Sequence, residues 1–250
     1  MFSTLIRFIA RLVWPGLLMT LAVQAHAGIV LNTTRLIYPG QDKEVSLLVH
    51  NTGTGDILAQ SWLEGDIQKP STASLPFAIT PALARMAGNA KQLIRVIYAG
   101  EGMADDRESV LWLNVQEIPQ SPGENELQIA IRQRIKVFYR PQGLAGDPLK
   151  AAQALQWRVL DGQLEVNNPG PYHVSMIKLA ASQRGRELFQ EDSRMLAPLQ
   201  RVRLPLSQTR DGAVELEFIS INDFGAQELY HASVSGEQVS QASRIEPLPR

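Results

Sequence analysis

Hydrophobic and polar positions alternate along most of the chain in short runs that end in turn residues. The runs are rich in β-branched and aromatic residues, and turn signals such as Asn51-Thr52-Gly53 separate them. This pattern is typical of a β-sandwich. In the first half of the chain it predicts strands over residues 45–50, 58–63, 77–79, 91–98, 109–115 and 127–139.

The pattern resumes after a segment that is rich in glycine and proline. Residues 140–148 carry these turn signals and are interpreted as a linker. Beyond the linker we expect a short helix or helical turn over residues 149–157. Further strands are expected over residues 163–166, 173–179, 201–206, 213–221 and 228–235.

These elements predict an all-β protein with two domains. The first domain spans residues 28–145, and the second, smaller one spans residues 146–238. Residues 239–250 are polar and contain prolines, so we expect a loose tail there.

The first 27 residues have the layout of an export signal. Arg7 and Arg11 precede an apolar stretch over residues 12–23, and Ala25-His26-Ala27 then provides the small-x-small pattern of a signal-peptidase site. The apolar stretch is shorter than the roughly 20 residues of a good membrane span. We expect cleavage before Gly28 and export to the periplasm. A retained N-terminal anchor is the alternative.

Charge and cysteine content narrow the classes of function. Removing Arg7 and Arg11 with the signal leaves 22 of the 24 basic residues against all 25 acidic ones, a net charge of −3. That balance does not predict binding to nucleic acid or to anionic lipid, and no second apolar run reaches membrane length. The absence of cysteine excludes disulfides, a thiol nucleophile and a Cys₂His₂ zinc site, so each domain must bury a core.

Catalytic patterns are absent from the sequence. His50, His173 and His231 lie in different predicted strands, and we interpret each as a sheet-surface or loop residue. No H-E-x-x-H, glycine-rich phosphate loop or G-x-S-x-G occurs. Asp105-Asp106 is expected to be a solvated loop pair, although two acids brought together across strands would suffice for glycoside hydrolysis. We predict that the protein is not an enzyme and needs no metal or cofactor.

The most specific signals are motifs that occur in a fixed order. Residues 33–35 read T-T-R, and residues 106–119 read D-R-E-S-V-L-W-L-N-V-Q-E-I-P. Residues 127–141 end in I-K-V-F-Y-R-P, and N-P-G-P-Y and I-N-D-F-G follow at residues 168–172 and 221–225. Over nearly the whole mature chain these motifs resemble the periplasmic pilus chaperones of the chaperone–usher pathway, the PapD-like family.

The resemblance implies two immunoglobulin-like domains set at an angle, with a cleft between them. It implies a chaperone that works without ATP, caps a pilus (fimbrial) subunit by donor-strand complementation and delivers it to an outer-membrane usher. Leu127, Ile129 and Ile131 match the donated side chains, and their spacing of two places them on one face of a strand. The alternative is that these residues face the domain's own core. An apolar row of this kind would also allow self-association.

Five charged residues also fall at family positions. Arg35 and Lys136 match two cleft cations that anchor the subunit's C-terminal carboxylate, which suits a guanidinium that can grip a carboxylate with two hydrogen bonds. Strict alternation, however, puts Lys136 on the face opposite to Leu127, Ile129 and Ile131, unless a twist or bulge intervenes. Glu108, Arg140 and Asp223 match a charged cluster that bridges the two domains.

The chain also departs from the family pattern. The family often has a disulfide near the end of the second domain, and none is possible here. The loop over residues 120–126 is short, as in one branch of the family. The alternatives to a chaperone are an exported adhesin or pilus subunit and a secreted carbohydrate-active enzyme with β-sandwich domains.

Overall fold

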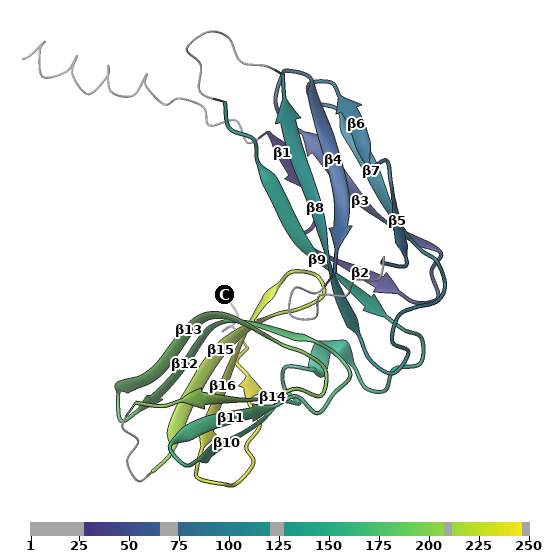
Figure 1. Ribbon diagram of the computed structural model, residues 1–250. Helices are drawn as coiled ribbons and strands as arrows, with labels where there is room; N and C mark the ends of the chain where they lie inside the picture. Colours follow the sequence, from purple (N-terminus) through teal and green to yellow (C-terminus); the bar gives the residue numbers. More distant parts are fainter. Residues whose placement is uncertain (1–27, 66–74, 121–127, 208–211, 247–250) are drawn as a thin grey trace, which may run out of the picture.

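The structure is a computed structural model that describes residues 28–65, 75–120, 128–207 and 212–246. Two β-sandwiches lie at an angle to each other and meet at one end (Figure 1). The only helix in the described ranges is a single 3₁₀ turn, η1 (Pro148–Lys150). The prediction of an all-β protein with two sandwich domains is therefore confirmed. The proposed export signal and Leu127 lie outside the described residues.

The first sandwich pairs a four-stranded sheet with a five-stranded one. The smaller sheet has the order β1 (Ile29–Leu31), β3 (Glu44–Asn51), β7 (Lys91–Tyr98) and β5 (Phe77–Thr80). The larger has the order β2 (Arg35–Pro39), β9 (Arg132–Arg140), β8 (Ser109–Pro119), β4 (Ile57–Glu64) and β6 (Leu83–Met86). Every pairing in this domain is antiparallel except β2 with β9, which is parallel.

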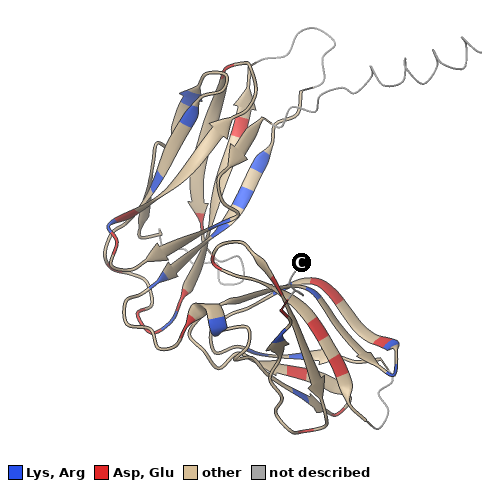
Figure 2. Ribbon diagram, turned by 180° about the vertical axis from the view of Figure 1, so that it is seen from behind, with Lys and Arg blue, Asp and Glu red and all other residues tan. Residues whose placement is uncertain are grey.

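Alternation along β8 shows how the first core is built. Leu111, Leu113 and Val115 point inward and are at most 2% exposed, because successive side chains of a strand point to opposite faces of its sheet. Ile135 and Val137 do the same on β9. The intervening residues of both strands lie on the outer face of the sheet, and basic residues recur along β9 there (Figure 2).

The second sandwich also has two sheets. The smaller has the order β10 (Gln156–Leu160), β11 (Gln163–Asn167) and β14 (Arg201–Pro205). The larger has the order β13 (Arg186–Leu196), β12 (Val174–Gln183), β15 (Val214–Ile221), β16 (Gln227–Val234) and β17 (Ser243–Arg244). Its core contains Trp157 and Phe218, whose ring centroids are 5.6 Å apart, and the Tyr230 ring stacks on Phe218.

Three expectations about elements need correction. The expected helical turn is present as η1 and the turn over residues 151–154, but it ends before residue 157, because Gln156 already begins β10. The tail is not loose over its described part: Ser240 bridges to Trp157, Ala242 is 1% exposed and β17 pairs with β16. The strand expected over residues 127–139 begins only at Arg132 in the described chain, because the ladder with β8 ends where Gln116 faces Arg132.

Candidate functional site

The parallel pair of β2 and β9 brings two basic residues together. Arg35 is the first residue of β2, and it lies in register with Lys136 on β9. Side chains that are directly in register project from the same side of a sheet, so both cations lie on one face. Two residues that are far apart in the sequence thus form one positively charged locus where the two domains meet.

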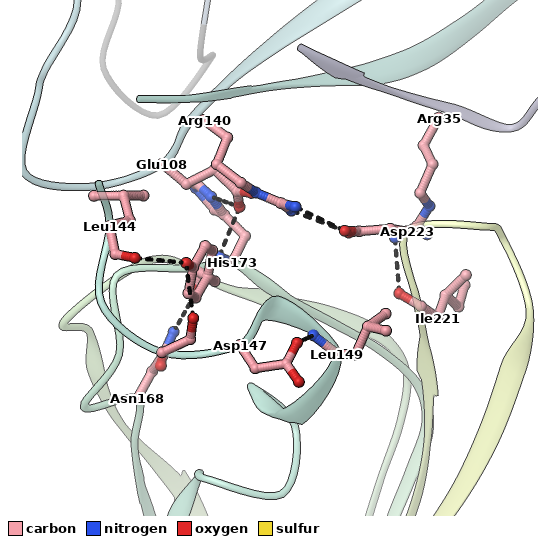
Figure 3. Close-up of polar contacts among 12 residues, drawn as sticks. Arg35, Glu108, Arg140, Leu144, Asp147, Leu149, Asn168, His173, Ile221 and Asp223 are labelled. Carbon is pink, nitrogen blue, oxygen red and sulfur yellow. Dashed lines mark hydrogen bonds and ion pairs between the residues drawn. The ribbon is translucent and has the colours of Figure 1, made fainter. Parts of the chain in front are cut away.

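Arg35 reaches across to the second domain. Its Nη1 donates a hydrogen bond of 2.8 Å to the carbonyl oxygen of Ile221 (Figure 3), and its guanidinium carbon lies 5.8 Å from the centre of the Phe138 ring. The residue is 8% exposed, and its Nε has no hydrogen-bond partner among the described residues. Burial lowers the pKa of Arg35, and the charges of Asp223 and Glu108 partly oppose this effect.

Lys136 has an aromatic neighbour but no acidic partner. Its Nζ lies 5.6 Å from the centre of the Trp112 ring, and no ion pair of Lys136 occurs in the described part of the chain. Burial, and then the nearby charge of Arg35, lower the pKa of Lys136 below the ordinary 10.5. Two adjacent cations with lowered pKa values favour the approach of an anion.

The orientation of Lys136 follows strict alternation. The ladder between β8 and β9 runs from Gln116–Arg132 to Ser109–Tyr139 without a register shift, so no bulge intervenes within β9. Ile135 and Val137 face the core, whereas Lys136 faces the opposite side. Within β9, Lys136 therefore lies on the outer face of the sheet, opposite to Ile135 and Val137.

One edge of β9 is open over its first half. β2 pairs with β9 only from Lys136 onward, so residues 132–135 have β8 on one side and no strand on the other in the described chain. Just upstream, Ile129 is 69% exposed and Ile131 is 40% exposed. The carbonyl oxygen of Ile131 still accepts a hydrogen bond of 2.9 Å from the Glu117 N–H, which keeps this segment beside β8.

A second group of charged residues joins the domains (Figure 3). Arg140, at the end of β9, donates from Nη2 to Glu108 Oε1 at 2.8 Å and from Nη1 to Asp223 Oδ2 at 2.8 Å. Glu108 precedes β8 and is 3% exposed, while Asp223 lies in the turn between β15 and β16. The three residues that the motifs singled out thus form one network across the interface.

Two further residues complete this network and were not predicted. The backbone N–H of His173 donates to Glu108 Oε2 at 2.8 Å, and His173 Nδ1 lies 2.9 Å from the same oxygen. Arg140 also lies over the Tyr172 ring, 5.2 Å from its centre. His173 does lie in a loop, directly before β12, but it is not a surface residue, since its side chain is 5% exposed. Its position directly after the N-P-G-P-Y motif was the available signal.

The hydrogen bonds of the network also determine the protonation of Arg140. Burial alone would lower the pKa of Arg140, but the hydrogen bonds and charges of Asp223 and Glu108 outweigh it and raise the pKa. Arg140 therefore stays charged and fully paired. By contrast, the pKa values of Arg35 and Lys136 are both lowered.

A small pocket lies between the domains beside both groups. Arg35, Glu108 and Phe138 contribute to its wall from the first domain, and His173 and Asp223 contribute from the second. In the described ranges no cluster of histidine and acidic residues could hold a metal ion. Helices long and apolar enough to cross a membrane are also absent from these ranges.

Comparisons with known proteins identify the family. Residues 28–145 match "Pili and flagellar-assembly chaperone, PapD N-terminal domain", and residues 150–232 match "Pili assembly chaperone PapD, C-terminal domain". The chain therefore belongs to the PapD family of pilus-assembly chaperones, a family whose members are not enzymes. The predicted family and the predicted immunoglobulin-like fold are confirmed.

Individual relatives agree with this assignment. The chaperone protein FimB/FhaD of Bordetella pertussis is 38% identical over 231 residues, which cover 88% of this chain and 93% of that protein. The probable fimbrial chaperone YadV of Escherichia coli K12 is 35% identical, and the match covers 83% of this chain and 90% of that protein. The crystal structure of the YadV chaperone superposes with a TM-score of 0.71 at 34% identity, over 83% of this chain and all of that one.

Proposed function

We propose that this protein is a periplasmic chaperone that binds pilus subunits by donor-strand complementation and delivers them to an outer-membrane usher without ATP. The observation that carries the proposal is the parallel pairing of β2 with β9, which leaves the edge of β9 open upstream of Arg35 and Lys136. An open edge is a template for pairing with a strand of another chain.

The direction and end point of the added strand follow from β2. A subunit strand that pairs with residues 132–135 and continues the line of β2 runs parallel to β9 and ends next to Arg35. Its last group is then a C-terminal carboxylate, which suits two adjacent cations. Its donors would be Arg35 Nε and the ammonium group of Lys136, neither of which has an acidic partner among the residues that the structure describes. Fixing one end of a strand also fixes its register.

The apolar row supplies the contact with the body of the subunit. Ile129 and Ile131 are exposed large apolar residues beside the open edge. Leu127, which lies outside the described residues, is the third member of the row expected from the sequence. Burying three such side chains in a partner's groove would contribute roughly 5–9 kcal/mol before the costs of association. The charged network of Arg140 has a different role, which is to fix the angle between the domains. At that angle the apolar row and the pair of cations, Arg35 and Lys136, contact the same subunit.

Co-expression with the neighbouring pilus subunit genes tests the proposal. We expect a one-to-one complex in periplasmic extract, and we expect Ile129→Asp to abolish it while the variant stays folded by circular dichroism. The matched control is Leu93→Asp, an exposed apolar residue on β7 of the other sheet, which should leave the complex intact. Subunit levels that are equal with and without the chaperone would overturn the proposal.

A further inference from the structure

A carboxylate lies in the apolar row of β8 without a charged partner. Leu111, Leu113 and Val115 face the core, and the next residue on the same face is Glu117. It is 8% exposed, it faces Ala59 across the ladder with β4, and its Oε2 has no hydrogen-bond partner among the described residues. A buried carboxylate oxygen without a hydrogen-bond partner is costly, and this one is available to a ligand.

Gly28 lies directly against this carboxylate. A Cβ atom built on Gly28 would overlap all three atoms of the Glu117 carboxyl group, so a larger residue would have to displace it. Gly28 is itself held in place, because its carbonyl oxygen accepts hydrogen bonds from Thr52 N at 2.8 Å and from Thr52 Oγ1 at 3.2 Å. The next residue, Ile29, donates its backbone N–H to Glu117.

Gly28 is also the first residue of the mature chain in the cleavage proposed above. We propose that Glu117 is a binding site for the free α-ammonium group that forms on Gly28 when the chain is cleaved after Ala27. Hydrolysis of the Ala27–Gly28 peptide bond releases a primary amine, which takes up a proton at neutral pH. The ammonium then lies beside a buried carboxylate that has one unoccupied oxygen.

Other partners for Glu117 are less suitable. No basic side chain forms an ion pair with Glu117 in the described chain, and the nearby amide of Gln133 donates instead to the carbonyl oxygen of Ile29 at 2.6 Å. Burial raises the pKa of Glu117, and the Ile29 hydrogen bond only partly opposes this. An added cation would stabilise the ionised carboxylate.

The pair would link export to the stability of the chaperone. β1 follows Gly28 and contacts β9 through Gln133, at the end of the sandwich that carries the open edge. Only the processed chain has an α-ammonium group at this place. The first domain is therefore expected to be more stable after cleavage than before it.

The first experiment measures the pKa of the α-amino group. The mature protein is purified from periplasm, its mass is recorded, and its amine is ¹³C-methylated and titrated by NMR. We expect a chain that begins at Gly28, with an amine pKa above the ordinary range of about 7.7–8.0. In Glu117→Gln, and in a chain that begins at Ala27, the value should return to that range. Glu101→Gln, which changes an exposed acid of the same domain, is the control.

The second experiment measures stability in both chain forms. Glu117→Gln should raise the unfolding equilibrium constant of the Gly28 chain by about tenfold to a hundredfold, as for a hydrogen bond to a charged group. In the Ala27 chain it should have little effect. An ordinary amine pKa in the wild type, or equal destabilisation of both chains, would overturn the proposal. A measured mass showing that the mature chain begins at a residue other than Gly28 would also overturn the proposal. The proposed capture of subunits does not depend on this pair and would stand in either case.

Discussion

The two groups of charged residues between the domains differ in how their charges are balanced. Arg140 has an acidic partner on each side, Glu108 from its own domain and Asp223 from the other. Arg35 and Lys136 lie beside each other, and among the described residues their partners are one backbone carbonyl and two aromatic rings. The first group is balanced within the free protein. In the proposed function, the second would be balanced by a bound anion.

This difference separates the framework from the binding site. A buried charge that is paired across the interface holds the two domains in one relative geometry. A buried charge without an acidic partner is available to bind an anion from another molecule. Stability and subunit capture should therefore respond to different substitutions.

Arg140→Ala should lower the free energy of unfolding by about 3–5 kcal/mol, because it leaves Glu108 buried without its cation. Chemical denaturation measures this value, and small-angle scattering should show a changed angle between the domains. Arg107→Ala is the control. Arg107 forms a solvent-exposed ion pair with the neighbouring Asp106, so its loss should change stability only slightly. Equal effects of both variants would remove the distinction between framework and surface charges.

Arg35→Ala should weaken subunit binding strongly and lower stability only slightly, the reverse of what we expect for Arg140→Ala. We expect subunit binding to weaken by about 2–5 kcal/mol, because a carboxylate would lose its bidentate donor at a desolvated site. Stability should change much less than in Arg140→Ala, since the substitution removes a cation that burial already disfavours. Titration calorimetry with a peptide that ends in the subunit's C-terminal strand provides the measurement. Arg95→Ala, on the exposed face of β7, is the control for charge. Unchanged binding in Arg35→Ala would contradict the anchor.

The sequence motifs identified the charged residues of both groups, but they did not show which of these residues have partners of opposite charge. Residues Glu108, Arg140 and Asp223 were found because they lie inside specific motifs. His173 was missed because a lone histidine in a strand pattern carries no sign of Glu108, the carboxylate that the first domain brings to it. Contacts across an interface join residues that are distant in sequence, and no local pattern reports them.

Edges and docked segments were also difficult to predict. Alternation from residue 127 to 139 looks like one strand, yet regular pairing begins at Arg132 in the described chain, because the ladder with β8 ends where Gln116 faces Arg132. The tail looked loose because it is polar. The bridge at Ser240, the buried Ala242 and the pairing of β17 with β16 hold its described part, and none of these is visible in the composition.

Lys136 adds a pH dependence to subunit binding. Its pKa lies below 10.5 in the free protein, and a bound carboxylate would raise it, so the complex holds the proton more tightly. Between these two pKa values binding requires proton uptake, and affinity should fall as the pH rises, by at most about tenfold per pH unit. The free protein should gain stability as the pH rises from the lowered pKa of Lys136 to the ordinary 10.5, because over that range its unfolded form binds the proton more tightly. In Lys136→Met both slopes should vanish, and their persistence would assign the titration to another group.

The smallest effect is expected where a buried carboxylate has several cations. Glu165 is 2% exposed, like Glu108, but three arginines surround it: Arg158 at 2.5 Å, Arg203 at 3.0 Å and Arg201 at 3.7 Å. Burial raises the pKa of Glu165, and the hydrogen bonds of Arg158 and Arg203 outweigh this and lower it. Arg201→Ala should therefore reduce the free energy of unfolding by less than about 1 kcal/mol, because two partners remain and Arg201 is 58% exposed. Urea denaturation beside Arg140→Ala makes the comparison direct. A loss as large as that of Arg140→Ala would mean that the number of partners does not govern the stability of a buried acid here.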